Sequence, residues 1–308
     1  MKNLDQNIAG EHIPVMLEET IDGLALNAGD VVVDCTTNRG GHSIEIIKRI
    51  GPAGTLVCID LDEQALEEAE KKFAKIKNSP KIIYINKNFR EIKNILADLG
   101  LHKVDAVVAD LGLSSQELDV SGRGFTFQKD EPLLMTFSNK VIDDTLTAKD
   151  IVNTWQEETL ADVIYYFADE RYARRIAKAI VEKREENEIK TTFDLVNIIN
   201  SAVPAKYLNS KTNAATKTFQ ALRMATNDEV GAMKDLINAL PEILKIGGQA
   251  SIITFHSIED RIVKQTAREI ESLKPVNKKP LTANREEIIN NPRSRSAKLR
   301  IYKYEYNN

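Results

Sequence analysis

Four short apolar segments, each followed by a helical pattern, most constrain how this chain folds. They are V-V-V-D (31–34), T-L-V-C-I-D (55–60), K-I-I-Y-I (81–85) and V-D-A-V-V-A-D-L-G (104–112). Apolar strands that alternate with helices are typical of a parallel sheet covered by helices on both faces. The sequence therefore predicts an α/β fold with a mostly parallel sheet.

Helical patterns fill the gaps between these segments. Ser43 is the predicted cap of a first helix that ends at Gly51, since a Ser precedes apolar residues at helical spacing and a Gly follows them. One apolar face between Leu66 and Ile76 predicts a second helix, and residues 90–100 predict a third.

The alternation of strand and helix stops after the fourth segment. Residues 116–212 are mostly helical in pattern, including a helix that Thr192 caps and Pro204 closes. The sheet resumes in residues 240–257, which predict a helix, a glycine stop and a strand, and residues 297–306 alternate as an edge or hairpin strand does. We predict two domains: residues 1–115 with 213–308, and an inserted helical domain of residues 116–212.

The predicted ligand site lies beyond the carboxyl ends of the strands. The loop D-C-T-T-N-R-G-G-H-S (34–43) lacks the G-x-G-x-x-G pattern of dinucleotide sites, and Asn38 stands near where a first glycine is expected. Asn tolerates a positive φ, so the turn can form without that glycine. S-adenosylmethionine, a nicotinamide and a purely structural turn all remain compatible with this loop, and the first is favoured.

Charge is unevenly distributed along the chain. Residues 261–308 hold 12 Lys/Arg and 5 Asp/Glu, a balance of +7, so residues 1–260 carry −11 of the total −4. A basic tail on an acidic body indicates either a surface for a polyanion or a solubilising tail. Cys35 and Cys58 lie in apolar segments without zinc or disulfide spacing, which predicts a reduced, cytoplasmic protein with no metal site and no membrane segment.

A family resemblance becomes specific along several motifs. They are H-I-P-V-M-L-E-E (12–19), R-G-G-H-S (39–43), D-L-G-L-S-S (110–115), R-G-F-T-F-Q-K-D (123–130), T-F-Q-A-L-R (218–223), F-H-S-I-E-D-R-I-V-K (255–264) and N-P-R-S-R-S-A-K-L-R (291–300). In this order they resemble the bacterial small-subunit rRNA cytosine-N4 methyltransferase family (RsmH, formerly MraW), and they span nearly the whole chain.

The resemblance implies a class I S-adenosylmethionine-dependent methyltransferase fold with an inserted helical domain. It implies methyl transfer to the exocyclic amine of one cytidine in the decoding centre of 16S rRNA, with the small ribosomal subunit as partner. The implied cofactor contacts are Gly40, Gly41, His42, Asp60, Phe89, Asp110 and Glu117. Glu117 stands where the family has a glutamine, because S-S-P-Q-L-D reads S-S-Q-E-L-D in this chain.

Asp110 is the candidate catalytic residue. A cytosine amine is a poor nucleophile, and an acceptor for its hydrogens would direct its lone pair toward the methyl group and take up developing charge. Holding the cofactor is an equally compatible role for Asp110. Each other site residue has a structural alternative: His42 satisfying a turn carbonyl, Asp60 capping the next helix, and Phe89 packing in the core.

Basic side chains are predicted to meet RNA phosphates. The candidate RNA-binding residues are Arg123, Lys217, Arg223, His256, Arg261, Lys264, Arg293, Arg295 and Arg300. His256 follows a strand end, where a positioning hydrogen bond is favoured over catalysis. A solvated basic loop is the alternative for residues 293–300.

Two stretches depart from the family pattern. D-G-P-L-D-M-R-M-D reads D-E-P-L-L-M-T-F-S at 130–138, and H-P-A-T-R-T-F-Q reads N-A-A-T-K-T-F-Q at 213–220. Lys217 keeps the charge of the family's arginine but not its bidentate fork. These losses motivate one alternative, a degenerate relative that binds RNA or assists ribosome assembly without methylating.

A nicotinamide oxidoreductase is the second alternative, and the missing G-x-G-x-x-G speaks against it. The sequence leaves open whether the chain forms a homodimer and whether free rRNA or an assembled subunit is the substrate.

Overall fold

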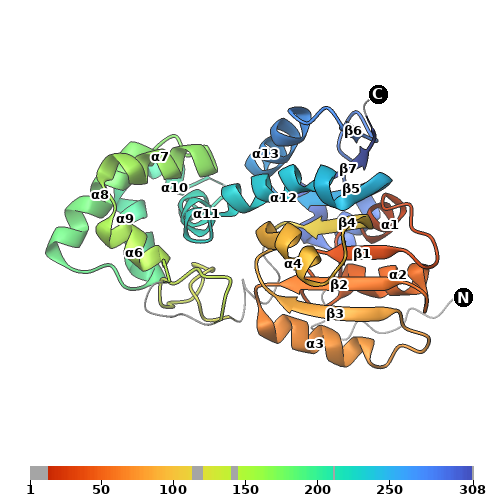
Figure 1. Cartoon of the computed structure of the whole chain (residues 1–308). Coiled ribbons are helices and arrows are strands. Elements are labelled where there is room, and N and C mark those ends of the chain that lie inside the picture. Colours follow the sequence, from red (N-terminus) through yellow and green to blue (C-terminus); the bar gives the residue numbers. More distant parts are fainter. Residues whose placement is uncertain (1–12, 113–120, 140–144, 211, 307–308) are drawn as a thin grey trace, which may run out of the picture. The chain divides into compact units, whose positions relative to one another are not determined.

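The structure, a computed structural model, describes residues 13–112, 121–139, 145–210 and 212–306 (Figure 1). The chain divides into two compact units, residues 1–112 with 234–308, and residues 113–233. The second unit includes the helix of residues 215–226, beyond the predicted end at residue 212, because this helix packs against the helix of residues 157–168.

The first unit is built on one sheet whose described strands follow the order β3-β2-β1-β4-β5-β7-β6. Their bounds are β1 Val31–Asp34, β2 Thr55–Asp60, β3 Lys81–Asn86, β4 Val104–Asp110, β5 Leu244–Thr254, β6 Leu273–Pro275 and β7 Lys298–Tyr304. β1 to β5 pair in parallel, and β7 is antiparallel to both β5 and β6. The mostly parallel sheet that the apolar segments predict is therefore confirmed.

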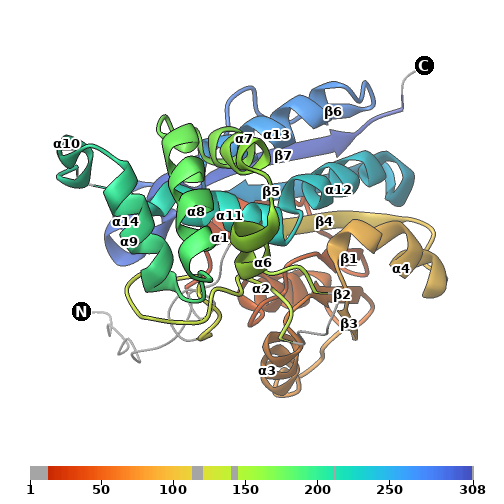
Figure 2. The same ribbon diagram turned by 90° about the vertical axis from the view of Figure 1, so that its left-hand side faces the viewer.

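Helices cover both faces of this sheet. They are α1 Leu17–Asp22, α2 Gly41–Ile50, α3 Glu63–Phe73, the 3-10 turn η1 Phe89–Glu91, α4 Ile92–Asp98, α12 Glu229–Ile243, α13 Ser257–Arg268, α14 Arg285–Asn290 and the 3-10 turn η2 Pro292–Ser296. Side chains of α1, α2 and α3 share a core with Val32, Leu56 and Ala106 of the strands. α4 and α12 lie on the other side of the sheet from α2 (Figure 2).

Two predicted boundaries in this unit were wrong. α2 starts at Gly41 with Gly40 at the cap, because Ser43 points inward and donates to Asp34. β5 begins at Leu244, before the two glycines, and the register between β4 and β5 shifts there. The predicted edge or hairpin strand is β7, which lies between β5 and β6 and pairs antiparallel with both, so it is not an edge strand.

The second unit consists of helices around their own core. They are α6 Ala148–Thr154, α7 Glu157–Ala168, α8 Ala173–Glu186, α9 Thr192–Ala202, α10 Ala205–Leu208 and α11 Ala215–Thr226. Thr191, not Thr192, caps α9, since its hydroxyl accepts from Asp194 N and the Asp194 carboxylate accepts from the Thr191 backbone. Trp155 packs, partly buried, on the core of the unit.

Retained residues of the altered stretch 130–138 belong to this core. Leu133 and Met135, both retained, are completely buried. Phe137, at a changed position, stacks on Phe125 with ring centroids 5.9 Å apart. The apolar positions that survive in this stretch are therefore the ones that packing requires. Across the described ranges, no helix is long and apolar enough to cross a bilayer.

Candidate active site

Three aspartates end neighbouring strands at one edge of the sheet. Asp34 ends β1, Asp60 ends β2 and Asp110 ends β4. These strands run in parallel, so their carboxyl ends, and with them the three carboxyl groups, meet at the same edge. Three carboxyl groups gathered at the carboxyl ends of the strands suit a ligand with positive charge or with hydroxyl donors.

The loop after β1 is held to the end of β2 by Asp60. One oxygen of its carboxylate accepts from Asn38 N at 2.7 Å and the other accepts from Asp62 N at 2.9 Å. Asn38 has a φ of 49°, so the predicted left-handed turn at this residue is confirmed. The alternative in which Asp60 caps the next helix is wrong, because Asp62 accepts from the first amides of α3.

Position 40 requires glycine for two reasons: its backbone conformation and the lack of room for a Cβ atom. Its φ is +78°, and a Cβ built on it would lie 2.3 Å from Phe73 Cζ, a buried ring. Gly41 is less crowded, since a Cβ there would lie 3.0 Å from Pro14 Cβ. The close approach of this turn to α3 therefore depends on a bare backbone at Gly40.

Gly40→Ala is expected to lower the urea midpoint of unfolding more than Gly100→Ala does. Gly100 also has a positive φ, +69°, but open space where the Cβ would go. Both variants carry the backbone strain of about 1–2 kcal/mol, and only Gly40→Ala adds an overlap costing about 1–3 kcal/mol. Equal midpoints for the two variants would contradict the close packing of the turn on Phe73.

His42 bridges the start of the chain and the end of β4. Its Nε2 lies 3.0 Å from the carbonyl oxygen of Val15, and its Nδ1 lies 4.0 Å from Asp110 Oδ2. A carbonyl only accepts, so Nε2 carries the proton in this contact and Nδ1 faces Asp110. His42 thus does satisfy a carbonyl, though not one of its own turn, and its predicted contact with a cofactor stays a prediction.

Asp34 sits at the centre of the edge and is almost completely buried. Its carboxylate accepts from the Ser43 hydroxyl at 2.6 Å and from Thr36 N at 3.1 Å. Burial raises the pKa of Asp34 to about 6, an effect that these two hydrogen bonds oppose. The hydroxyl of Thr36 in turn accepts from Asp110 N at 2.6 Å, so this short segment ties β1 to β4.

Asp110 is the least satisfied carboxyl group of the edge. Its Oδ1 is buried and has no hydrogen-bond partner among the residues that the structure describes. Burial, and then the charges of Asp34 and Glu259, raise the pKa of Asp110 to about 8. A buried oxygen without a hydrogen-bond partner destabilises the fold unless a ligand supplies that partner. Among the three carboxyl groups, Asp110 is therefore the one that a hydrogen-bond donor of a ligand would stabilise most.

Two predicted cofactor contacts remain outside this network. Phe89 begins η1, shortly after β3 ends at Asn86, and its side chain is half-buried. It therefore lies at the same end of the sheet as the three aspartates. Glu117 lies outside the described residues. The prediction for each of them stays a prediction.

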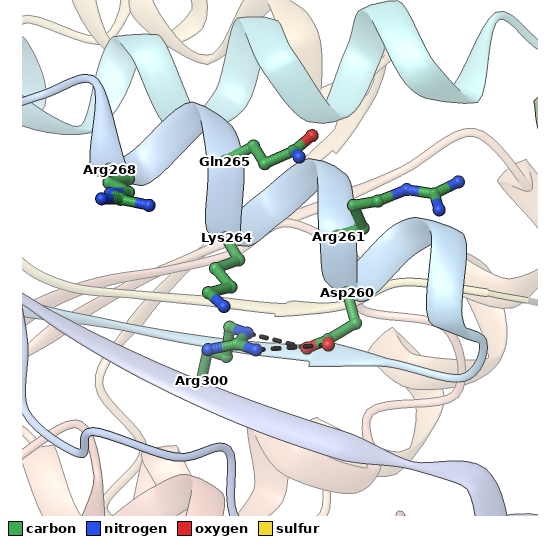
Figure 3. A pocket seen from close by; sticks show the side chains of 6 residues that line it. All are labelled: Asp260, Arg261, Lys264, Gln265, Arg268 and Arg300. Atoms are coloured by element: carbon green, nitrogen blue, oxygen red, sulfur yellow. Dashed lines mark hydrogen bonds and ion pairs between the residues drawn. The ribbon is translucent and has the colours of Figure 1, made fainter.

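Three of the predicted RNA-binding residues line one pocket in the first unit (Figure 3). Arg261 and Lys264 come from α13, and Arg300 comes from β7. Arg293 and Arg295 are exposed in η2, outside the lining of this pocket.

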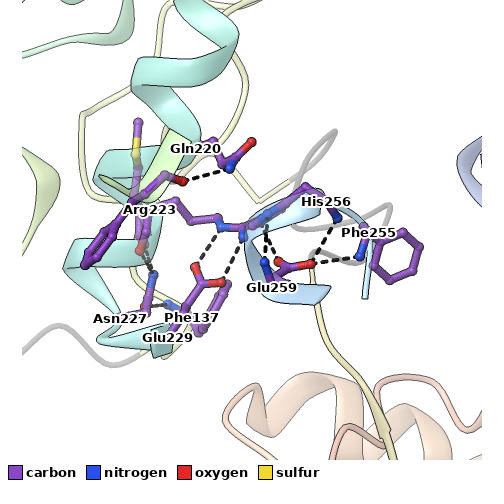
Figure 4. Close-up of polar contacts among 10 residues, drawn as sticks. Phe137, Gln220, Arg223, Asn227, Glu229, Phe255, His256 and Glu259 are labelled. Atoms are coloured by element: carbon purple, nitrogen blue, oxygen red, sulfur yellow. Dashed lines mark hydrogen bonds and ion pairs between the residues drawn. The ribbon is translucent and has the colours of Figure 1, made fainter. Parts of the chain in front are cut away.

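His256 is the cap of α13 (Figure 4). Its Nδ1 accepts from Glu259 N at 3.3 Å, and its Nε2 lies 2.7 Å from Glu259 Oε1. Glu259 also accepts from Phe255 N at 2.8 Å. The contacts of His256 shown here are those of a positioning residue, which is the role the sequence favours over catalysis.

The other three predicted RNA-binding residues belong to the helical unit and have partners there. Arg223 is buried and forms a bidentate ion pair with Glu229, at 2.7 and 2.8 Å (Figure 4). Arg123 is buried and donates through Nη1 to the carbonyls of Thr136 and Phe137. Lys217 donates to the carbonyl of Asp169 at 2.7 Å. These contacts organise the unit, and RNA binding by the three residues stays a prediction.

Several residues of the site were not singled out from the sequence. Thr36, in the turn after β1, accepts from the end of β4, and Ser43 in α2 donates to the end of β1; no spacing in the sequence indicates these hydrogen bonds. Arg268 and Gln265 also line the α13 pocket. Their signal was available, because residues 261, 264 and 268 fall on one face of a helix.

The chain is similar to one protein family and to several solved structures. Residues 9–305 match the model of the MraW methylase family. Similar solved structures include an rRNA methylase from Streptococcus thermophilus (TM-score 0.46, 9% identity, 96% of this chain and 100% of that one). Others are TrmN from Thermus thermophilus (0.47, 9%, 94% and 48%) and NSun6 from Pyrococcus horikoshii, solved with SFG (0.47, 13%, 100% and 57%). The family match and the sheet order together confirm the class I methyltransferase fold.

Proposed function

The chain belongs to the MraW methylase family, and on that premise we propose that it methylates the N4 amine of a cytidine in the decoding centre of 16S rRNA. The observation that carries the proposal is Asp110 at the end of β4, where the cofactor is expected: one of its carboxyl oxygens is buried and has no partner in the described part of the chain. The small ribosomal subunit is the proposed partner, and the cytoplasm, where that subunit is made, is the proposed location.

S-adenosylmethionine is the cofactor, and the residues at the edge of the sheet fit it. When bound, it supplies an electrophilic methyl group on a positively charged sulfur. Asp60 would hold the ribose hydroxyls, Gly40 and Gly41 would let the backbone approach the methionine portion, and Phe89 would pack on the adenine ring. Burial raises the pKa values of Asp34 and Asp110, and a cationic ligand would favour the ionised form of both carboxyl groups.

Asp110 is the proposed acceptor for the hydrogens of the target amine. Burial and the charges of Asp34 and Glu259 raise its pKa to about 8, which favours the protonated carboxyl at neutral pH. A cation bound nearby lowers that pKa, because opposite charge favours the ionised form. The carboxylate then accepts a hydrogen bond from the amine and stabilises the positive charge that develops on its nitrogen. No covalent enzyme intermediate is needed, and Cys35 and Cys58 are both buried.

His42 has a positioning part in this scheme. Its Nε2 contact with Val15 orients the ring so that Nδ1 faces Asp110, 4.0 Å away. The target base must leave its stack to reach such an edge. Cationic side chains of the predicted RNA-binding set would hold the opened strand through its phosphates.

The test is incubation of the purified chain with S-adenosylmethionine carrying a labelled methyl group and with small ribosomal subunits that lack the mark. Nucleoside mass spectrometry is expected to find labelled N4-methylcytidine, and at the decoding-centre cytidine. Binding of S-adenosylhomocysteine without any labelled cytidine would overturn the proposal in favour of a degenerate, RNA-binding relative. Thermal protection by NAD rather than S-adenosylhomocysteine would favour an oxidoreductase instead.

A further inference from the structure

We infer that the pocket between α13 and β7 binds successive backbone phosphates of the RNA strand that leads to the methylated cytidine. The inference rests on the proposed function and extends it to a phosphate track. The pocket has a volume of about 340 Å³ and is lined by Asp260, Arg261, Lys264, Gln265, Arg268 and Arg300 (Figure 3).

Positive charge dominates this pocket. Its lining holds four cationic side chains and one acidic side chain. The acid, Asp260, is already occupied, because it accepts two hydrogen bonds from Arg300 at 2.7 and 3.2 Å and one from Lys298 at 3.1 Å. These cations hold the pKa of Asp260 below its usual value despite its burial. Asp260 therefore holds the Arg300 side chain in the wall of the pocket. Its negative charge is balanced by Arg300 and Lys298, so it does not neutralise Lys264 or Arg268.

Two cations of α13 have no counter-charge within the described part of the chain. Lys264 and Arg268 are exposed, and neither forms a hydrogen bond or ion pair with another described residue. In Figure 3 the side chains of Lys264, Asp260 and Arg300 converge between the helix and the strand. Such a concave group of cations attracts anions, and a phosphate is the anion that guanidinium and ammonium groups bind together.

The spacing of the cations favours a chain of phosphates over a single small anion. Arg261, Lys264 and Arg268 share one face of α13 and span seven residues, which is roughly 10 Å along a helix axis. A free phosphate ion would use one end of that row. A nucleic-acid strand, with a charge at every nucleotide, uses its whole length.

The direction of α13 connects this row to the proposed site of methyl transfer. The helix begins directly after the carboxyl end of β5, with His256 as its cap, and packs against β5 as it continues. Arg268 ends the helix, roughly 18 Å along its axis from the cap. RNA that follows the row therefore leaves the edge where Asp110 lies and runs along the first unit.

The test is the double variant Lys264→Gln/Arg268→Gln, assayed for binding of a single-stranded RNA oligonucleotide around the target cytidine at several salt concentrations. We expect weaker binding at low salt and a slope of log K against log salt that is shallower by about 0.7 for each lost phosphate contact. Binding of S-adenosylhomocysteine is expected to be unchanged. The matched control is Lys71→Gln/Lys75→Gln, which removes the same charge from the exposed face of α3 and its end.

Equal loss of affinity in the control would overturn the inference, because the effect would then be one of net charge. An unchanged slope in the pocket variant would also overturn it, including the case in which only inorganic phosphate binding is lost. The proposed function fails separately, through absence of N4-methylcytidine in the reaction of the unaltered chain. If N4-methylcytidine is absent but the salt slope of the pocket variant is shallower, the phosphate track is still supported, for a different RNA reaction.

Discussion

Asp110→Asn is expected to slow methyl transfer by about 10²–10⁴-fold, the range of a lost general acid–base or charge-stabilising group. The variant keeps the shape of the side chain and its backbone hydrogen bond to Thr36. It loses the negative charge that would balance the cationic nitrogen as the new bond forms. The rate should therefore fall much more than the affinity for S-adenosylhomocysteine.

The same variant is expected to be more stable than the original chain at pH 8 to 9. Asp110 has a pKa of about 8 in the folded chain and close to its ordinary 3.8 when unfolded. The folded state therefore binds the proton more tightly, and stability falls as the pH rises between these two values. An amide does not titrate, so Asp110→Asn removes this loss. Each pKa unit corresponds to about 1.4 kcal/mol, so a gain of at least that size is expected in urea unfolding.

The control for Asp110→Asn is Asp98→Asn, a change at the exposed end of α4 that should alter neither rate nor stability. Single-turnover rates with excess enzyme and titrations with S-adenosylhomocysteine separate the two roles of Asp110. A rate equal to that of the original chain would exclude Asp110 from the chemistry. A rate that falls only in proportion to cofactor affinity would assign Asp110 to cofactor binding alone.

The sheet and its ligand edge were predictable because they rest on local patterns. Three of the four apolar segments lead into an acidic residue, and that alone places Asp34, Asp60 and Asp110 at the carboxyl ends of parallel strands. The positive φ of Asn38 was likewise predictable from the residue type. Such features depend on a few neighbouring residues, which is why the sequence alone is sufficient for them.

What the sequence did not predict depends on partners far along the chain. His42 contacts Val15, 27 residues earlier, and Asp260 pairs with Arg300, 40 residues later. Helix starts were misplaced for a related reason: Ser43 looks like a cap, yet its hydroxyl donates to Asp34 from inside α2. A side chain that satisfies a buried carboxylate cannot be distinguished locally from one that satisfies a helix end.

Charge alone was also a poor guide to which cations face solvent. Arg223 and Lys264 both occur in motifs that resemble the family, but the first is buried against Glu229 and the second is exposed. An arginine with a buried acidic partner stabilises the fold whether or not it meets RNA. A role of Arg223 in stabilising the fold and a role in binding RNA predict different results when Arg223 alone is replaced and when Arg223 and Glu229 are replaced together.

Arg223→Met is expected to destabilise the chain by about 3–5 kcal/mol, because it removes the guanidinium that pairs with the buried carboxylate of Glu229. Replacing both residues, Arg223→Met with Glu229→Met, should recover most of that loss, since buried ion pairs are often replaceable by apolar side chains of similar volume. Urea unfolding of the two variants measures the difference. Lys206→Met, at an exposed position of α10 in the same unit, is the control and should change stability by less than about 0.5 kcal/mol.

RNA binding by the double variant then decides whether Arg223 also contacts phosphate. If the ion pair with Glu229 is its whole function, the refolded double variant binds RNA as the original chain does, with the same salt dependence. If Arg223 also reaches a phosphate, binding stays weaker and the salt slope stays shallower by about 0.7 even though stability has returned. A double variant that is as unstable as Arg223→Met would contradict the premise itself, because the cost would then come from lost packing around Arg223 rather than from an unpaired charge on Glu229.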